Sequence, residues 1–207
     1  MSQKKFYLLQ VNDALFPIGA YSHSQGLETY IQNGIVHDEK TAEEYIKNKI
    51  KWNFATTELL SVKLAYESAE AESLEELEEL EEILEASRIP MEQRDAVRKM
   101  GSRFVKTIEK LDLEINKTGI YKEYVTARKG KNISHSCVYG VFCSALGIEL
   151  EEALEHYLYA QTSAMVTNCV KTIPLSQSVG QKLLSRCFFE FQEVLETLKT
   201  QTKEDLC

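Results

Sequence analysis

The stretch LFPIGAYSHSQGLE, residues 15–28, holds two glycines, a proline and a histidine directly before a helical pattern. Proline fixes φ and glycine adopts positive φ easily, so the Pro-Ile-Gly step at 17–19 predicts a rigid turn. Ser22, followed three residues later by Gln25, has the spacing of a capping box and predicts a helix beginning at Ser22. Gly26 would lie inside that helix at a cost of about 1 kcal/mol relative to alanine, so we expect close approach of another backbone or a partner there.

The rest of the chain shows apolar residues at helical spacing, with no sustained alternation of β-branched and polar residues. We therefore expect an all-α fold, an irregular single-domain bundle of about seven or more helices over residues 1–207, with residues 200–207 fraying. After the first helix, which we expect to stop at Gly34, the predicted helices are a long one opened by a capping box at 41–44 and reaching about Ala71, an acidic one at 74–84, one from Pro90 to Leu111, a short one within 116–132, and others at 134–146, 149–172 and 176–199.

Composition restricts the kinds of partner. The chain has 207 residues, of which 43% are hydrophobic and 27% charged, and these proportions are typical of one globular domain. A net charge of −8 argues against nucleic acid or an anionic membrane as the main ligand. The sequence contains neither an apolar run of about 20 residues nor a signal peptide pattern, so we expect a cytoplasmic protein.

The cysteine pattern also favours the cytoplasm. Their number is odd, they form no CxxC pair, and most lie among apolar helical residues; they are Cys137, Cys143, Cys169, Cys187 and Cys207. This pattern is typical of buried free thiols under reducing conditions rather than of a disulfide scaffold.

Catalytic and metal-binding patterns are weak. His23 lies between two serines, but nucleophilic catalysis also needs an orienting acid and an oxyanion site, and the sequence indicates neither. His23, His135 and Cys137 are metal-binding residue types; the His135 and Cys137 pair is suggestive, but without the i, i+4 spacing of a helical chelating pair the signal is weak, and all three remain open candidates. There is no phosphate-binding loop, which argues against nucleotide hydrolysis by this chain alone.

Residues 15–28 resemble the N-terminal signature LPIGGF(A/S)HSxGLE of UreF-type urease accessory proteins. The stretch VKTIPLSQ at 170–177 is similar to the family's VRLIPLGQ, and Gly180 and Gln181 continue the likeness. Residues 94–104 resemble the family's basic helix with its Met-Gly step, and residues 135–147 resemble its HxxxxG…ALG helix. The resemblance covers nearly the whole chain.

The resemblance implies a non-enzymatic scaffold that forms a homodimer. Such a scaffold binds the accessory protein UreD (also called UreH), recruits and regulates the GTPase UreG, and helps to assemble the nickel centre of apo-urease. Nickel would be handled transiently by the complex, with no tightly bound cofactor. The partner-binding or dimer surface that the resemblance implies consists of Pro17, Gly19, Tyr21, His23, Ser24, Gly26, Glu28, Lys171, Pro174, Gln177, Gly180 and Gln181.

This chain departs from the family pattern at four positions. Ala20 and Ser176 replace glycines, which reduces backbone freedom, and Tyr21 replaces phenylalanine. Lys171 replaces an arginine, so any contact with a partner carboxylate loses its bidentate geometry.

Two functions of other classes stay open on the sequence. One is an all-helical enzyme acting on a small molecule, with His23 and Glu28 in its pocket. The other is a nickel store that uses the glutamates of the helix at 74–84, although a solvated helix face is the commoner reason for such a run.

Overall fold

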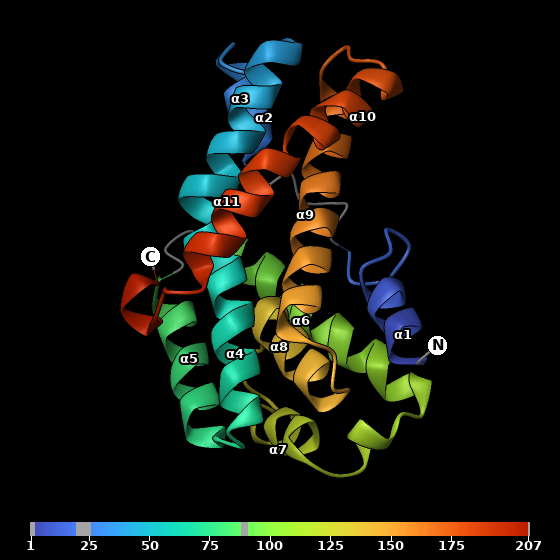
Figure 1. The fold of residues 1–207 in the computed structure, drawn as a ribbon, viewed down its shortest axis with the longest axis vertical. Coiled ribbons are helices and arrows are strands. Elements are labelled where there is room, and N and C mark those ends of the chain that lie inside the picture. Colours follow the sequence, from blue (N-terminus) through green and yellow to red (C-terminus); the bar gives the residue numbers. More distant parts are fainter. Residues whose placement is uncertain (1–2, 20–25, 88–90, 207) are drawn as a thin grey trace.

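The structure is a computed structural model that describes residues 3–19, 26–87 and 91–206, with the backbone alone at 91–93 (Figure 1). Helices and turns make up these residues and no strand occurs among them, which confirms the predicted all-α fold. Tyr21, His23 and Ser24 lie outside the described residues, as does the capping pattern at 22–25. None of the described helices combines the length and the apolar character needed to cross a membrane.

The helices pack as an irregular bundle (Figure 1). In chain order the α-helices are α1 (Gln3–Val11), α2 (Leu27–Gln32), α3 (Glu39–Lys49), α4 (Leu60–Glu70), α5 (Leu74–Ser87), α6 (Met91–Ile108), α7 (Ile120–Ala127), α8 (His135–Ala145), α9 (Leu150–Thr172), α10 (Gln177–Arg186) and α11 (Phe188–Leu198). A π-helix, η2 (Ile50–Leu59), joins α3 to α4, and short 3-10 helices occur at η3 (Glu109–Leu111), η4 (Glu114–Asn116) and η5 (Lys203–Asp205).

The helix of the first motif begins differently from the prediction. Gly26 has a φ of +94° and immediately precedes α2, so it lies outside the helix rather than within its face. A Cβ built on Gly26 would meet nothing within 4 Å, so the position requires positive φ and not the close approach that we expected. The predicted stop is confirmed, because α2 ends at Gln32 and Gly34 has a φ of +69°.

The long helix predicted up to about Ala71 is confirmed as the continuous run of α3, η2 and α4. Its capping box lies three residues earlier than predicted. The Asp38 carboxylate accepts a hydrogen bond from the Thr41 amide at 2.8 Å, and the Thr41 hydroxyl accepts one from the Asp38 amide at 3.0 Å. Aspartate is the better N-cap because its side chain reaches the free amides of the first turn, and these bonds hold the pKa of Asp38 below its usual value.

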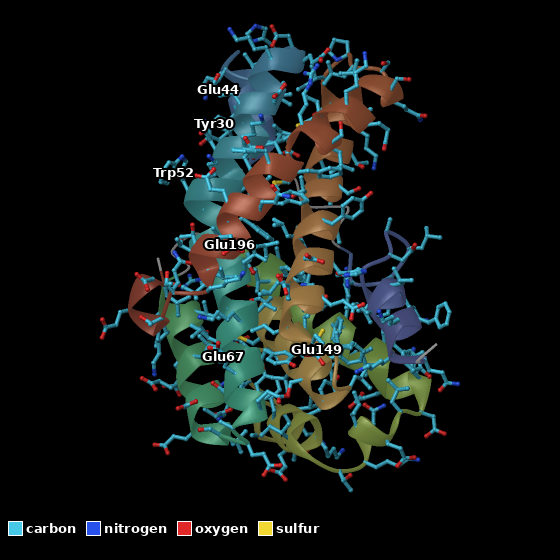
Figure 2. The ribbon with its side chains drawn as sticks, viewed as in Figure 1. Tyr30, Glu44, Trp52, Glu67, Glu149 and Glu196 are labelled. Carbon is cyan, nitrogen blue, oxygen red and sulfur yellow. The ribbon has the colours of Figure 1, made fainter. Side chains whose placement is uncertain are left out.

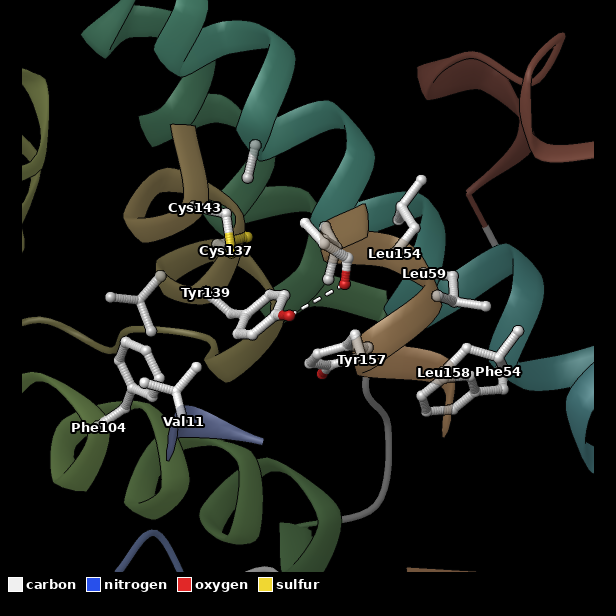
Figure 3. Close-up of a cluster of buried hydrophobic side chains, with 14 of the residues drawn as sticks. Val11, Phe54, Leu59, Phe104, Cys137, Tyr139, Cys143, Leu154, Tyr157 and Leu158 are labelled. Carbon is white, nitrogen blue, oxygen red and sulfur yellow. Dashed lines mark hydrogen bonds between the residues drawn. The ribbon is translucent and has the colours of Figure 1, made fainter. Parts of the chain in front are cut away.

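Helix α8 forms the centre of the core, with every residue from His135 to Ser144 buried. It packs closely on α4, since a Cβ at Gly140 would lie 2.5 Å from the Val62 carbonyl oxygen. Figure 3 shows Tyr139 of α8 donating a hydrogen bond from its hydroxyl to the Ala153 carbonyl at 2.9 Å, beside Tyr157 at a ring-centroid distance of 4.8 Å. Aromatic rings thus join α8 to α9 on one side while the glycine admits α4 on the other.

The acidic helix α5 turns a leucine stripe inward, as predicted. Leu77, Leu80 and Leu84 are buried, and most of its glutamates are solvated. Glu81 is the exception, with 1% of its surface exposed. Its carboxylate accepts hydrogen bonds from the Ser134 amide and from the Ser134 hydroxyl, each at 2.8 Å, and a third from the Tyr124 hydroxyl. Glu81 therefore ties α5 to α7 and to the N-terminus of α8.

The C-terminal region differs from the prediction in two ways. The single helix predicted for 176–199 divides at Cys187 into α10 and α11, which run in different directions in Figure 1. The segment predicted to fray forms an ordered turn over residues 200–206. The Lys63 ammonium donates a hydrogen bond to the Gln201 carbonyl at 2.7 Å, and Lys203 pairs with Glu79 at 2.6 Å, so two lysines hold this end on α4 and α5.

The four cysteines within the described residues are buried free thiols, as predicted, and Cys207 lies outside those residues. Burial raises the pKa of Cys169 to about 12 and that of Cys187 to about 11. Both thiols are therefore protonated and unreactive at neutral pH.

We expect Gly140→Ala to lower the free energy of unfolding by about 1–3 kcal/mol, because the new methyl group would push α8 away from the Val62 carbonyl. Helix propensity alone predicts the opposite sign, a gain of about 1 kcal/mol. Urea denaturation measures the difference. Ser102→Ala, at an exposed position of α6, is the matched helical control and should change stability by less than about 0.5 kcal/mol. An unaltered or raised stability of Gly140→Ala would contradict the close contact.

Candidate docking surfaces

The second motif lies where α9 ends and α10 begins (Figure 1). Pro174 interrupts the helical path as predicted, because α9 stops at Thr172 and Ile173 is extended and buried. Ser176 then caps α10 by accepting a hydrogen bond from the Val179 amide at 3.2 Å. Among the residues predicted to contact a partner, those of this motif with exposed side chains are Lys171, Pro174, Gln177 and Gln181.

Gly180 differs from the other members of the second motif because it is buried. A Cβ at this position would lie 2.7 Å from a methyl carbon of Val170 and 3.4 Å from one of Val166. The glycine therefore allows α10 to pack on α9. Its place in the structure is one of helix packing rather than of contact with a partner.

The end of the first motif lies at the same end of the bundle. Helix α2 packs against α9, and the rings of Tyr30 and Tyr45 are 5.2 Å apart (Figure 2). Burial, with smaller contributions from Cys169, Tyr30 and Glu28, raises the pKa of Tyr45 to about 12. We use the name α2–α10 surface for the exposed motif residues at this end of the bundle, which are Gly26, Glu28, Lys171, Pro174, Gln177 and Gln181.

Ion pairs fix the helices beneath the α2–α10 surface. Arg186 of α10 lies 2.9 Å from carboxylate oxygens of both Glu39 and Glu43, and Lys47 pairs with Glu43 at 3.0 Å and with Glu190 at 3.2 Å. Burial alone would raise the pKa of Glu43, but the two cations outweigh it and lower that pKa. Exposed pairs contribute little stability individually, whereas this linked set holds α10 and α11 in register with α3.

The beginning of the first motif lies against α6 instead. The ring of Phe16 packs on that of Phe104 at 5.6 Å, and the Arg103 guanidinium donates a hydrogen bond to the Ile18 carbonyl at 3.4 Å. Gly19 has a φ of +80°, which favours glycine, and a Cβ there would also displace the Arg103 guanidinium, which would lie 2.0 Å away. Pro17 is exposed. The described parts of the first motif therefore belong to two surfaces rather than one.

Pro17 borders a groove of about 480 Å³ between α1 and α6. We name it the α1 groove; its lining comprises Phe6, Leu9, Gln10, Asp13, Leu15, Phe16, Pro17 and Thr107. The sequence reasoning missed it because it did not predict α1, which is apolar on two faces: Leu8 and Val11 are buried whereas Phe6 and Leu9 are exposed. The spacing of Phe6 and Leu9, three residues apart on a second apolar face, was the available signal.

The metal candidates do not form a site in the described structure. His135 is 4% exposed, its ring stacks on that of Tyr157 at 5.6 Å, and its Nδ1 lies 3.3 Å from the Tyr157 hydroxyl. Burial lowers the pKa of His135 to about 4, so the imidazole is neutral at pH 7. Cys137 is also buried, and side chains two residues apart on a helix point in different directions. Within the described ranges no three His, Cys, Asp or Glu side chains cluster as metal ligands; His23 lies outside those ranges.

Fold and site together define the class: an all-α protein whose motif residues lie mainly on exposed surfaces at helix ends. A comparison with protein families then gives the particular family. The UreF family model matches residues 36–188, well over half of the 207-residue chain, so the chain belongs to the UreF family of urease accessory proteins. The match includes the second motif and begins after the first. The chain therefore has a role in urease maturation, in a family of accessory proteins rather than of known enzymes.

The burial of His135 predicts a pH-dependent stability. The folded ring stays neutral down to a pKa of about 4, whereas the unfolded ring protonates near pH 6.5. As the pH falls below about 6.5, the unfolded state alone gains a proton, so the free energy of unfolding decreases by up to about 1.4 kcal/mol per pH unit. Urea denaturation between about pH 5 and pH 7 measures this slope, which His135→Phe should remove.

The exposed His37 provides the matched control, and His37→Gln should keep the slope of the native chain. An unchanged slope in His135→Phe would show that His135 is accessible to protons in the folded state.

Proposed function

We propose that this chain is a non-enzymatic, cytoplasmic scaffold that helps to deliver nickel to apo-urease. In this proposal it forms a homodimer, binds UreD (UreH), and through that complex recruits and regulates the GTPase UreG. Membership of the UreF family is the observation that carries the proposal. The exposed motif residues on two surfaces support it, since a scaffold must present rigid contacts to more than one partner.

The contacts are assigned to the α2–α10 surface and to the loop that carries Pro17 and Gly19. Tyr21, His23 and Ser24 belong to the same proposal by their position in the motif. Pro174 and the caps of α10 restrain the backbone, so little conformational entropy remains to be lost on binding. Co-purification with UreD or with UreG separates the two partners.

Nickel is the cargo of the assembly in this proposal, passed on by the complex and held by no tightly bound cofactor of this chain. GTP hydrolysis belongs to UreG. The UreF chain would contribute to both steps by positioning its partners, and neither step requires a nucleophile or a base from the chain itself.

We expect Glu28→Arg to reduce the nickel content and the activity of urease roughly tenfold or more in cells that carry the other accessory proteins, because a reversed charge on an exposed contact disrupts a partner interface. Co-purification of UreD and UreG with the variant, with and without nucleotide, identifies which contact is lost. Gln181→Arg, on the same surface, should act in the same direction.

Glu123→Arg is the matched control, since Glu123 is equally exposed but lies on α7, at the opposite end of the bundle in Figure 1. Circular dichroism should show the same helicity in all variants. Urease with a full nickel complement from Glu28→Arg and Gln181→Arg cells would refute the assignment of the α2–α10 surface.

A further inference from the structure

We propose that the α1 groove binds an amphipathic α-helix of a partner protein, one that presents an apolar ridge flanked by acidic side chains. The inference rests on the proposed docking role of the chain, and it adds the chemistry of the segment that docks. It follows from the apolar lining of the groove, its open shape and the charges beside it.

The apolar lining is unusually exposed. Phe6 is 58% exposed, Leu9 54% and Leu15 90%, and all three line the same groove. Large apolar side chains that gather in one exposed place mark interaction sites more often than single exposed residues do. Burying these three side chains against a partner supplies the hydrophobic contribution to binding.

The open shape favours a helix over a small molecule. Sites for small molecules enclose most of the ligand and aim a few polar groups at it. Here three large apolar lining residues, Phe6, Leu9 and Leu15, are themselves more than half exposed, so they cannot enclose a small ligand. The polar lining residues are Gln10, Asp13 and Thr107. The Asp13 carboxylate also accepts a hydrogen bond from the Leu15 amide at 2.7 Å, so it serves the loop. A ridge of leucine-like side chains at helical spacing suits this apolar trough.

The charges beside the groove determine which side chains the partner helix should carry next to its apolar ridge. Thr107 lines the groove; Arg103 lies four residues before it, one turn away on the same side of α6, and Lys110 lies three residues after it, in η3. Both are exposed, and neither forms an ion pair with any residue that the structure describes. Lys106 adds a third exposed cation to residues 103–110, which also hold one exposed carboxylate, Glu109, so that the stretch carries a net charge of +2. In a chain with a net charge of −8, such a local basic edge favours acidic side chains on the partner.

The same charges argue against a second copy of this chain as the occupant. The occupant must offer acidic flanks, whereas the α1 groove of a second copy offers the same basic edge instead. The acidic helix α5 is no better a candidate, because Leu77, Leu80 and Leu84 face its own core. The occupant that fits is therefore a helix from another protein.

Peptide binding to the purified full chain tests the inference. The probe is a fluorescent synthetic helix of about 20 residues, with leucines at i, i+3, i+4 and i+7 and glutamates at the flanking positions. One comparison peptide carries lysines in place of the glutamates, and another has the same composition in scrambled order. Fluorescence anisotropy should show saturable binding of the acidic helix, at least roughly tenfold tighter than that of either comparison peptide and weaker at high salt.

Variants place the binding in the groove. Leu15→Lys should abolish binding of the acidic helix. Trp52→Lys is the control and should leave binding unchanged, because Trp52, although 78% exposed, projects from η2 on the side of the molecule opposite α1 (Figure 2). Arg103→Glu combined with Lys110→Glu should shift the preference toward the lysine peptide. The absence of binding, equal binding of the acidic and basic helices, or unchanged binding by a folded Leu15→Lys variant would each overturn the inference.

These results stay separate from the urease assay. If the peptides fail to bind while Glu28→Arg still blocks nickel delivery, the groove proposal falls and the scaffold proposal stands. If the acidic helix binds but neither Glu28→Arg nor Gln181→Arg affects urease, the groove proposal stands and the assignment of the α2–α10 surface falls.

Discussion

The bundle depends on the burial of α8, a helix that has no solvated face from His135 to Ser144. A helix in this position needs a neighbour on every side, and Gly140 meets that need by letting the α4 backbone come close. At its N-terminus α8 also needs partners for polar groups that water cannot reach, and Glu81 supplies them to Ser134. The positions of α4, α5 and α7 around α8 follow from these two requirements.

The packing around α8 also restrains the backbone that carries the exposed motif residues. The break at Ile173 and Pro174 comes at the end of α9, whose earlier part is fixed by the aromatic contacts of Tyr157 with α8. Beyond the break, Arg186 ties α10 back to α3. A surface held from both sides loses little entropy when it binds, which is the physical advantage of a scaffold over a flexible loop.

The sequence predicted most of this fold because helical periodicity is a strong signal over a long amphipathic segment, as in α6, and because no segment alternates as a strand would. The sequence-based prediction was wrong where a single residue determines the start or the end of a helix. Asp38 and Thr41 are both good caps, and the choice of Asp38 depends on the mutual bonds of these two side chains. From the sequence, Gly26 could lie inside a helix or directly before one, and only its φ of +94° shows that it precedes the helix. The split at Cys187 follows no proline or glycine, so the composition of that segment gave no sign of it.

The candidate sites were harder to predict than the fold, since a surface depends on which helices meet. The residues of both motifs were identified, but their division between two surfaces required the contact of Phe16 with Phe104 and that of α2 with α9. Glu81 was visible in principle, because it occupies a position of the leucine stripe four residues after Leu77 and three before Leu84. A charge at such a position indicates a buried polar contact whenever the stripe faces the core.

Arg103 belongs both to the packing of the first motif and to a candidate docking surface. Its guanidinium donates a hydrogen bond to the Ile18 carbonyl and lies directly beside Gly19, whose φ of +80° favours glycine. The same side chain belongs to the basic edge of the α1 groove, beside Pro17 and Thr107. Because one arginine both positions the motif loop and supplies charge to the groove, a partner that attracts its guanidinium also acts on the loop. If a helix binds in the α1 groove as proposed, its binding and the conformation at Gly19 would be coupled through this single side chain.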